Sequence, residues 1–107
     1  MRFRVILHEG VVPEALRPQL ATEIGRIYAS LFETPAAEMG VDFTELPRGR
    51  FFTAAKLSTS SIIAGTVPAG TPNEQRHRLL AEITALWCET TGCTPHEVVV
   101  TAADARA

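Results

Sequence analysis

Thr71-Pro72-Asn73-Glu74 and Val12-Pro13-Glu14 open two similar segments of this sequence. Their prolines are 59 residues apart (72 − 13), and Glu23-Ile24 recurs as Glu82-Ile83 at the same spacing (82 − 23 = 59). Each segment is followed by Thr-Pro and then by an apolar run. The chain therefore contains two copies of one unit, in which a helix connects two strands.

Both segments carry apolar side chains at helical spacing. In the second, Thr71 and Glu74 have the spacing of a capping box, Pro72 suits the first helical position, and Gly92 suits the C-terminal cap. In the first, Pro18 lacks an amide donor, so we expect a loose first turn and regular helix from about residue 18. The predicted buried faces consist of Leu16, Leu20, Ile24, Ile27, Tyr28 and Leu31, and of Leu79, Leu80, Ile83, Leu86 and Trp87.

Four further runs predict strands, at residues 3–7, 40–46, 61–65 and 98–101. A strand, a helical crossover and a second strand form a right-handed parallel pair. We therefore predict an α/β fold of one domain, in which two consecutive βαβ units form a four-stranded sheet with both helices on one face. Residues 1–46 form the first unit, 47–60 a turn and linker that includes a short return strand at 51–52, and 61–107 the second unit.

The predicted sheet has a second face that no helix covers. A chain of 107 residues has no other segment to cover that face, so we expect further subunits to bury it. The sequence thus predicts a homo-oligomer.

Composition excludes several classes of function. The net charge is −2, and no basic run suggests a nucleic acid or an anionic membrane as partner. No apolar stretch reaches the roughly 20 residues of a membrane span, and no signal peptide is apparent. Cys88 and Cys93 fit reduced thiols in a cytoplasmic protein. The histidines His8, His77 and His96 lack metal-ligand spacing, so we predict no metal site, and no cofactor.

Several of these features resemble the tautomerase superfamily. They are the two βαβ units, the first strand that begins at residue one and the Glu9-Gly10 strand end. Residues 41–52, VDFTELPRGRFF, look most like the cis-chloroacrylate dehalogenase branch. The resemblance covers the chain from Met1 to about Asp104. It implies a trimer whose strands meet across subunits around a central barrel, with chemistry at an N-terminal proline.

Carried over position by position, the resemblance implies that most of the usual machinery is missing. Only the pocket aromatic has a counterpart, at Phe51 or Phe52. The family's proline falls at Met1, and the arginine that commonly follows the first Glu-Gly falls at Val11. The arginine that opens the second strand of oxalocrotonate tautomerase falls at Gly40. In the dehalogenase, the two carboxylate-binding arginines fall at about Pro68 and Thr71, the helical histidine near Ile27 and the late glutamate near Ala103, next to Asp104.

Met1 is the first candidate for chemistry. Arg2 is too large for the enzyme that removes initiator methionines, so Met1 should remain and carry a primary α-amine. Burial, or the nearby cations Arg2 and Arg4, would lower the pKa of such an amine below its ordinary 7.7–8.0. The amine would then act as a base or condense with a carbonyl as an imine. In the competing interpretation Met1 plugs a relic pocket.

Candidate binding residues are arginines and aromatics. Arg48 and Arg50 flank Gly49 beside Phe51 and Phe52, and a turn can aim two guanidinium groups at one carboxylate. Solvated turn charges are the alternative interpretation. Arg2 is a further candidate for an anionic ligand, although Arg2 and Arg4 equally suit intersubunit salt bridges to Asp42 or Glu45.

The sequence therefore predicts a tautomerase-superfamily homotrimer without the catalytic proline. Its isomerase-type activity on a small carbonyl or carboxylate compound is expected to be weak, absent or atypical, with catalysis at Met1 and binding by Arg2, Arg48, Arg50, Phe51 and Phe52. Two alternatives stay open: a non-catalytic binding or assembly subunit, and a ferredoxin-like ligand-binding dimer. Adjacent, parallel first and second strands would exclude the ferredoxin-like fold.

Overall fold

A computed structural model describes residues 2–33, 40–47, 52–53, 56–57 and 61–104. All four predicted main strands and both helices are present, and the first, third and fourth of these strands are longer than predicted. The elements in chain order are β1 (Arg2–His8), the 3-10 turn η1 (Glu14–Leu16), α1 (Arg17–Phe32), β2 (Gly40–Leu46), β3 (Phe52–Thr53), β4 (Lys56–Leu57), β5 (Ser61–Val67), α2 (Asn73–Thr91), the 3-10 turn η3 (Pro95–Glu97) and β6 (Val98–Asp104).

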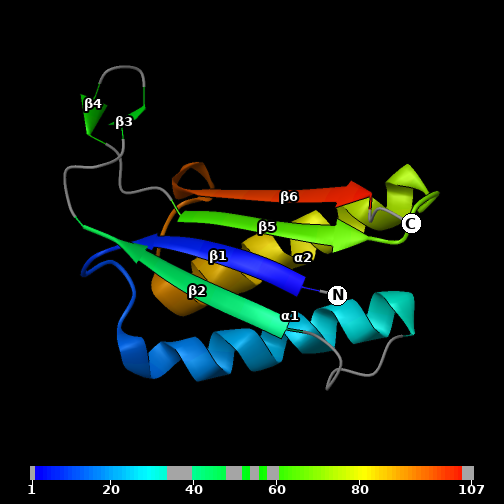
Figure 1. The fold of residues 1–107 in the computed structure, drawn as a ribbon, viewed down its shortest axis with the longest axis horizontal. Helices are drawn as coiled ribbons and strands as arrows, with labels where there is room; N and C mark the ends of the chain where they lie inside the picture. Colours follow the sequence, from blue (N-terminus) through cyan, green and yellow to red (C-terminus); the bar gives the residue numbers. More distant parts are fainter. Residues whose placement is uncertain (1, 34–39, 48–51, 54–55, 58–60, 105–107) are drawn as a thin grey trace.

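The main sheet has the strand order β2-β1-β5-β6, and α1 and α2 pack on the same face of it (Figure 1). β1 pairs with β2 in parallel, with Arg2 opposite Gly40, and β5 pairs with β6 in parallel, with Ser61 opposite Val98. The two central strands, β1 and β5, are antiparallel. This confirms the two βαβ units and excludes the ferredoxin-like alternative.

The short return strand is confirmed at Phe52. β3 pairs with β4 in a separate antiparallel ladder, with Phe52 opposite Leu57. Phe51, the other residue predicted for this strand, lies outside the described residues.

The repeat also appears in the packing of the two helices. Buried residues at equivalent places are 59 apart: Leu20 and Leu79 (79 − 20), Ile24 and Ile83 (83 − 24), and Tyr28 and Trp87 (87 − 28). The residues that end the helices, Glu33 and Gly92, are also 59 apart (92 − 33), and both have left-handed backbones. The two units therefore end their helices by the same backbone geometry.

The core lies between the helices and the sheet. Phe3, Val5 and Leu7 of β1 and Ile63 and Val67 of β5 alternate along their strands toward the helices and are fully buried. Each such side chain contributes about 1.5–3 kcal/mol when it leaves water. The central strands thus supply the part of the sheet that holds both helices.

The start of α1 agrees with the expectation drawn from Pro18. A 3-10 turn, η1, precedes the helix, and Pro18 lies in its first turn, where no intrahelical donor is needed. The Thr22 hydroxyl donates to the Pro18 carbonyl at 3.0 Å.

The predicted capping box at Thr71 and Glu74 is wrong. Pro72 is the N-cap of α2, and the Thr71 hydroxyl donates to the Pro68 carbonyl at 2.6 Å instead of to the helix. A capping box forms at η3, where the backbone amide and hydroxyl of Thr94 donate to Glu97 Oε1 at 2.9 and 3.0 Å. These bonds hold the pKa of Glu97 below its ordinary value, because they favour the charged carboxylate.

The face of the sheet opposite the helices is partly apolar. Alternation along the strands places Ile6, Ile62 and Val99 on it, and Val99 is 49% exposed. Among the described residues, neither helix is both long and apolar enough to cross a bilayer.

Candidate functional site

One end of the sheet gathers the segments that build the site. β1 begins there at Arg2, close to the last residues of β5, because Phe3 lies opposite Gly65 in the antiparallel ladder. α1 ends and α2 begins at the same end (Figure 1). The loop that connects β5 to α2, residues 68–72, crosses this end.

Between the end of α1 and the start of α2 lies a hollow of about 500 Å³, called here the α1/α2 pocket. An adjoining space of about 370 Å³ continues it along the two helices. The residues that line the main part are Ser30, Leu31, Phe32, Glu33, Pro68, Ala69, Gly70, Thr71, Pro72 and Gln75. The hollow is broadly open to solvent, so it would enclose a small organic ligand only in part.

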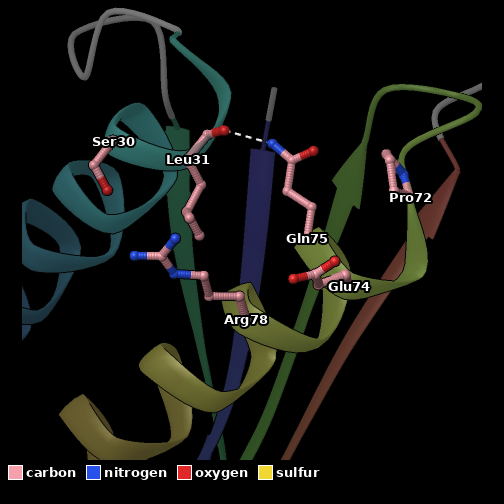
Figure 2. A pocket seen from close by; sticks show the side chains of 6 residues that line it. All are labelled: Ser30, Leu31, Pro72, Glu74, Gln75 and Arg78. Atoms are coloured by element: carbon pink, nitrogen blue, oxygen red, sulfur yellow. Dashed lines mark hydrogen bonds between the residues drawn. The ribbon is translucent and has the colours of Figure 1, made fainter.

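Gln75 closes the side of the pocket where the helices meet. Its side-chain amide donates to the Leu31 carbonyl near the C-terminus of α1, as Figure 2 shows. This bond satisfies one of the carbonyls that the last turn of a helix leaves without a partner. It also links the two helices at the edge of the pocket.

The charge of the pocket differs between its two parts. The residues that line the main part include no arginine or lysine, and Glu33 is the one acidic residue among them. Arg78 and Glu74 line the adjoining part, but the Arg78 side chain is 71% exposed and pairs with Glu82 at 3.4 Å. A carboxylate ligand in the main part would therefore find no guanidinium among the described lining residues.

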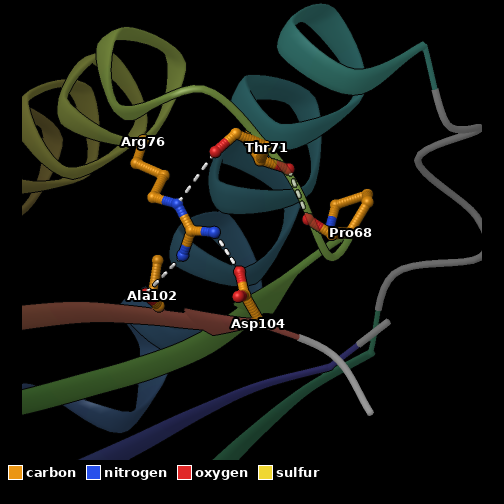
Figure 3. Close-up of polar contacts among 5 residues, drawn as sticks. All are labelled: Pro68, Thr71, Arg76, Ala102 and Asp104. Atoms are coloured by element: carbon orange, nitrogen blue, oxygen red, sulfur yellow. Dashed lines mark hydrogen bonds and ion pairs between the residues drawn. The ribbon is translucent and has the colours of Figure 1, made fainter. Parts of the chain in front are cut away.

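Arg76 lies behind the loop of residues 68–72 (Figure 3). Its guanidinium donates to the Thr71 carbonyl at 3.2 Å and to the Ala102 carbonyl at 3.4 Å, and it forms an ion pair with Asp104. Only 20% of the Arg76 side chain is exposed. Arg76 thus ties the pocket loop to the end of β6, and its charge is neutralised by a carboxylate of the chain itself.

An aromatic cluster lies next to the pocket. Tyr28 stacks on Phe32, a pocket residue, with ring centroids 4.5 Å apart, and meets Phe3 edge-on at 5.9 Å. Tyr28 is fully buried, and its hydroxyl has no hydrogen-bond partner within the described part of the chain. Burial raises the pKa of the Tyr28 phenol, because it disfavours the phenolate. Tyr28 does not line the pocket itself, but its ring contacts Phe32, which does. The cluster therefore places a protonated hydroxyl next to a residue of the pocket wall.

Of the predicted site residues, Arg2 is placed by the structure. Its side chain forms an exposed ion pair with Asp42 of the same chain, with Nε 3.3 Å from Oδ2. Glu45 pairs with Arg17, also within the chain. Both acids thus have a partner within the chain, because β2 lies beside β1 and brings Asp42 within reach of Arg2, and the intersubunit pairs stay a prediction. Met1, Arg48, Arg50 and Phe51 lie outside the described residues, as does the side chain of Phe52.

The histidines and cysteines lie in different surroundings. His8 is buried, whereas His77 on α2 and His96 on η3 are exposed. No group of three potential metal ligands occurs among the residues with described positions. Cys88 and Cys93 are both free thiols.

The sequence did not single out Arg76 at this end, and it gave no contact for Asp104 or for the Tyr28 hydroxyl. A basic residue near the first turn of a helix is unfavourable next to the positive end of the helix dipole unless a partner neutralises it. The position of Arg76 near the start of α2 could therefore have singled it out and prompted a search for an acidic partner. For Tyr28, helical spacing predicts burial but gives no information on its hydroxyl.

Comparison with known proteins gives the family. No family sequence model matches the chain, and no curated protein sequence does. The crystal structure of native Ps01740 is similar over 100% of this chain and 96% of its own, with 34% identity and a TM-score of 0.95. N1, a member of the cis-3-chloroacrylic acid dehalogenase family, is 20% identical over 98% of this chain and 75% of its own, with a TM-score of 0.92.

A fused 4-OT, solved as a wild-type symmetric trimer, is 16% identical over 98% of this chain and 85% of its own, with a TM-score of 0.87. These similarities cover both βαβ units and agree with the strand order described above. The chain belongs to the tautomerase superfamily.

Proposed function

We propose that this chain is a tautomerase-superfamily protein that works without the catalytic proline, on a small carbonyl or carboxylate compound bound in the α1/α2 pocket. Conventional tautomerisation of dicarboxylates is weak or absent. The reacting group is the primary amine of Met1, and Arg2, Arg48, Arg50, Phe51 and Phe52 are the proposed binding residues. Since β2 ends opposite His8, at the far end of the sheet from this pocket (Figure 1), Arg48, Arg50, Phe51 and Phe52 are proposed to act from a neighbouring subunit of the trimer. The cytoplasm is its proposed location.

The observation that carries this proposal is the charge of the pocket. Pro68 and Thr71, which correspond to carboxylate-binding arginines in the family resemblance, both line its main part, where no described basic residue is found. Each charge-assisted hydrogen bond lost in this way removes about 1.5–3 kcal/mol of binding. A ligand with one carbonyl suits such a pocket better than a dicarboxylate.

The amine can act in two ways. A neutral amine can take the proton from the carbon next to a carbonyl, which leaves an enolate and an ammonium group. Alternatively it can condense with the carbonyl carbon, which releases water and leaves an imine. The second route is open to a primary amine and gives a product that can be trapped.

The trapping experiment uses pyruvate with cyanoborohydride, which reduces an imine to a stable secondary amine. Lys56 is the chain's single lysine, so the Lys56→Arg variant leaves Met1 as the one primary amine. We expect one added group on this variant, located in the N-terminal peptide by mass spectrometry. Absence of the adduct under conditions that modify a free peptide amine would exclude the imine route and leave the amine only the role of a base.

A second test restores the usual base. The chain that lacks Met1 and carries Arg2→Pro should tautomerise an enol pyruvate faster than the natural chain, since a proline then begins β1. Robust turnover by the natural chain would contradict the weak activity proposed here. Circular dichroism of both chains controls for loss of the fold.

A non-catalytic binding or assembly subunit is the second candidate, and the Arg76–Asp104 ion pair favours it. The Arg76 guanidinium donates to the Thr71 carbonyl of the pocket loop, and its ion pair with Asp104 leaves it less available to an anionic substrate. A thermal-shift measurement with pyruvate, combined with the trapping and turnover assays, distinguishes the two candidate functions. Stabilisation by pyruvate without imine trapping or turnover supports a binding subunit.

We also propose a homotrimer, in which the face with Ile6, Ile62 and Val99 is covered by neighbouring subunits. The exposed Val99 and the trimeric 4-OT relative support this assembly. Sedimentation analysis should give a trimer for the natural chain and smaller species for Val99→Asp. A natural chain that is monomeric at micromolar concentration would contradict the proposed homotrimer.

A further inference from the structure

Cys88 and Cys93 meet at the end of α2 that is far from the α1/α2 pocket. Cys88 lies in the last turn of α2, and Cys93 follows the helix cap. Their sulfur atoms are 3.8 Å apart, and both side chains are half-buried. This is van der Waals contact, compared with about 2.05 Å in a disulfide bond.

The backbone brings the two thiols together. Gly92 ends the helix with a left-handed φ of 76°, and its amide donates to the Cys88 carbonyl at 2.9 Å. The chain therefore turns back toward the helix immediately before Cys93. No other residue type adopts this backbone as readily as glycine, so the turn depends on Gly92.

Two further contacts hold Cys93 in place. Its amide donates to the Thr91 hydroxyl at 3.3 Å, and that hydroxyl donates to the Trp87 carbonyl at 2.7 Å. On its other side, the Thr94–Glu97 capping box fixes the start of η3. The pair of thiols is thus held by hydrogen bonds on both sides of Cys93.

We propose that Cys88 and Cys93 are a redox modification site, which forms a reversible intramolecular disulfide by exchange with a small disulfide such as oxidised glutathione. In the first step a cysteine thiolate attacks one sulfur of glutathione disulfide, its S–S bond breaks, and one glutathione thiolate leaves. In the second step the other cysteine attacks the mixed disulfide, the Cys88–Cys93 bond forms, and the second glutathione leaves. The protein loses two electrons and two protons, and glutathione disulfide becomes two thiols.

Burial raises the pKa of Cys88, and the contact with Cys93 and then the negative charge of Glu97 raise it further. Either thiol can attack first, because the two sulfur atoms are in contact and both side chains are half-buried.

The bond would join the last turn of α2 to the segment that leads into β6. Trp87 anchors that turn in the core, and Val98, at the start of β6, is also buried. We therefore expect oxidation to suppress opening of the connection between α2 and β6, and to slow hydrogen exchange at the amides of Gly92 and Cys93.

The experiment incubates the purified full chain with oxidised and reduced glutathione at several ratios, quenches with acid and alkylates free thiols. Both cysteines lie in the tryptic peptide 79–106, so their state is read together by mass spectrometry. In excess oxidised glutathione we expect loss of both alkylation sites, a mass lower by two hydrogen atoms and no retained glutathione. Dithiothreitol should restore both sites.

Persistence of both alkylation sites, a stable glutathione adduct on the natural chain, or a disulfide-linked dimer would each overturn the proposal. If conversion to the disulfide is complete and hydrogen exchange at the amides of Gly92 and Cys93 is unchanged, the expected effect on the connection between α2 and β6 is wrong.

The matched controls are Cys88→Ser and Cys93→Ser. Each should retain one glutathione, because no second thiol resolves it. Loss of glutathione from either variant without added reductant would contradict the exchange between the two thiols. Circular dichroism shows whether each variant is folded. If a variant does not fold, the experiment on the natural chain still tests whether the disulfide forms.

Discussion

The ring of Phe3 lies so close to Gly65 that a β-carbon on residue 65 would be 2.1 Å from Phe3 Cε1. The two residues are opposite each other in the ladder between β1 and β5. Real β-carbons essentially never approach another atom so closely. The close contact between the central strands, and with it the position of Phe3 beside Tyr28, therefore depends on the absence of a side chain at residue 65.

Gly65→Ala should lower the free energy of unfolding by about 1–3 kcal/mol, the usual cost of overpacking a core. Urea denaturation measures this loss. In the background of Phe3→Leu the same change should cost less, because the smaller side chain vacates the contested space. An equal cost in both backgrounds would show that the Phe3 ring is not the cause.

Glu33→Gly should stabilise the protein by about 0.5–1 kcal/mol. Glu33 ends α1 with a left-handed φ of 54°, which glycine adopts without the clash of a β-carbon. Gly92 already has this role at the end of α2, so Gly92→Ala is the matched change and should destabilise. A neutral or destabilising Glu33→Gly in thermal unfolding would contradict the strain assigned to residue 33.

Tyr28→Phe should leave the protein equally stable or up to about 1 kcal/mol more stable, because it removes a buried hydroxyl that has no partner among the described residues. The stacked and edge-on ring contacts remain. A loss of more than about 1 kcal/mol in urea would show that the hydroxyl has a partner.

The same tyrosine predicts a dependence on alkaline pH. The pKa of the buried phenol is raised, so the unfolded chain loses this proton first as the pH rises past about 10. Stability should therefore fall above that pH, since the unfolded state then binds fewer protons. Tyr28 is the single tyrosine, so the difference between the natural chain and Tyr28→Phe isolates its contribution. Identical pH profiles for the two chains would refute the prediction.

Arg76→Met should cost about 1–3 kcal/mol, because the carbonyls of Thr71 and Ala102 lose their donor while the aliphatic stem is kept. Asp104→Asn should cost under about 1 kcal/mol, since the Asp104 side chain is 57% exposed. Arg78→Met, with an exposed guanidinium, is the control and should be nearly neutral. Urea denaturation of the three variants checks the ranking, and equal costs at residues 76 and 78 would contradict the role given to Arg76.

The sequence was sufficient for the fold because its strongest signals are local and repeated. Helical spacing and the 59-residue offset predicted α1, α2 and the two parallel pairs, and Pro18 predicted the late start of α1. The capping box was placed wrongly because Thr71 and Thr94 have the same spacing to a glutamate. A threonine caps a helix only when its hydroxyl has no closer acceptor. The Thr71 hydroxyl has one, because it donates to the Pro68 carbonyl.

The candidate site was less accessible to sequence reasoning because its contacts join distant segments. Arg76 meets Asp104 across 28 residues, and Gln75 meets Leu31 across 44. Neither pair has a spacing that marks it in one sequence. The contact between Phe3 and Gly65 likewise depends on a strand register that alternation alone does not supply.

The order β2-β1-β5-β6 makes the chain a covalently joined pair with an approximate internal twofold axis between its central strands. Each end of the molecule then receives one helix start, one helix end and the tips of both central strands. In such a duplicated architecture the two ends can have different roles, because residues at one end can change while the other end and the shared core stay the same. Here one end has an open hollow, and the opposite end has a pair of thiols.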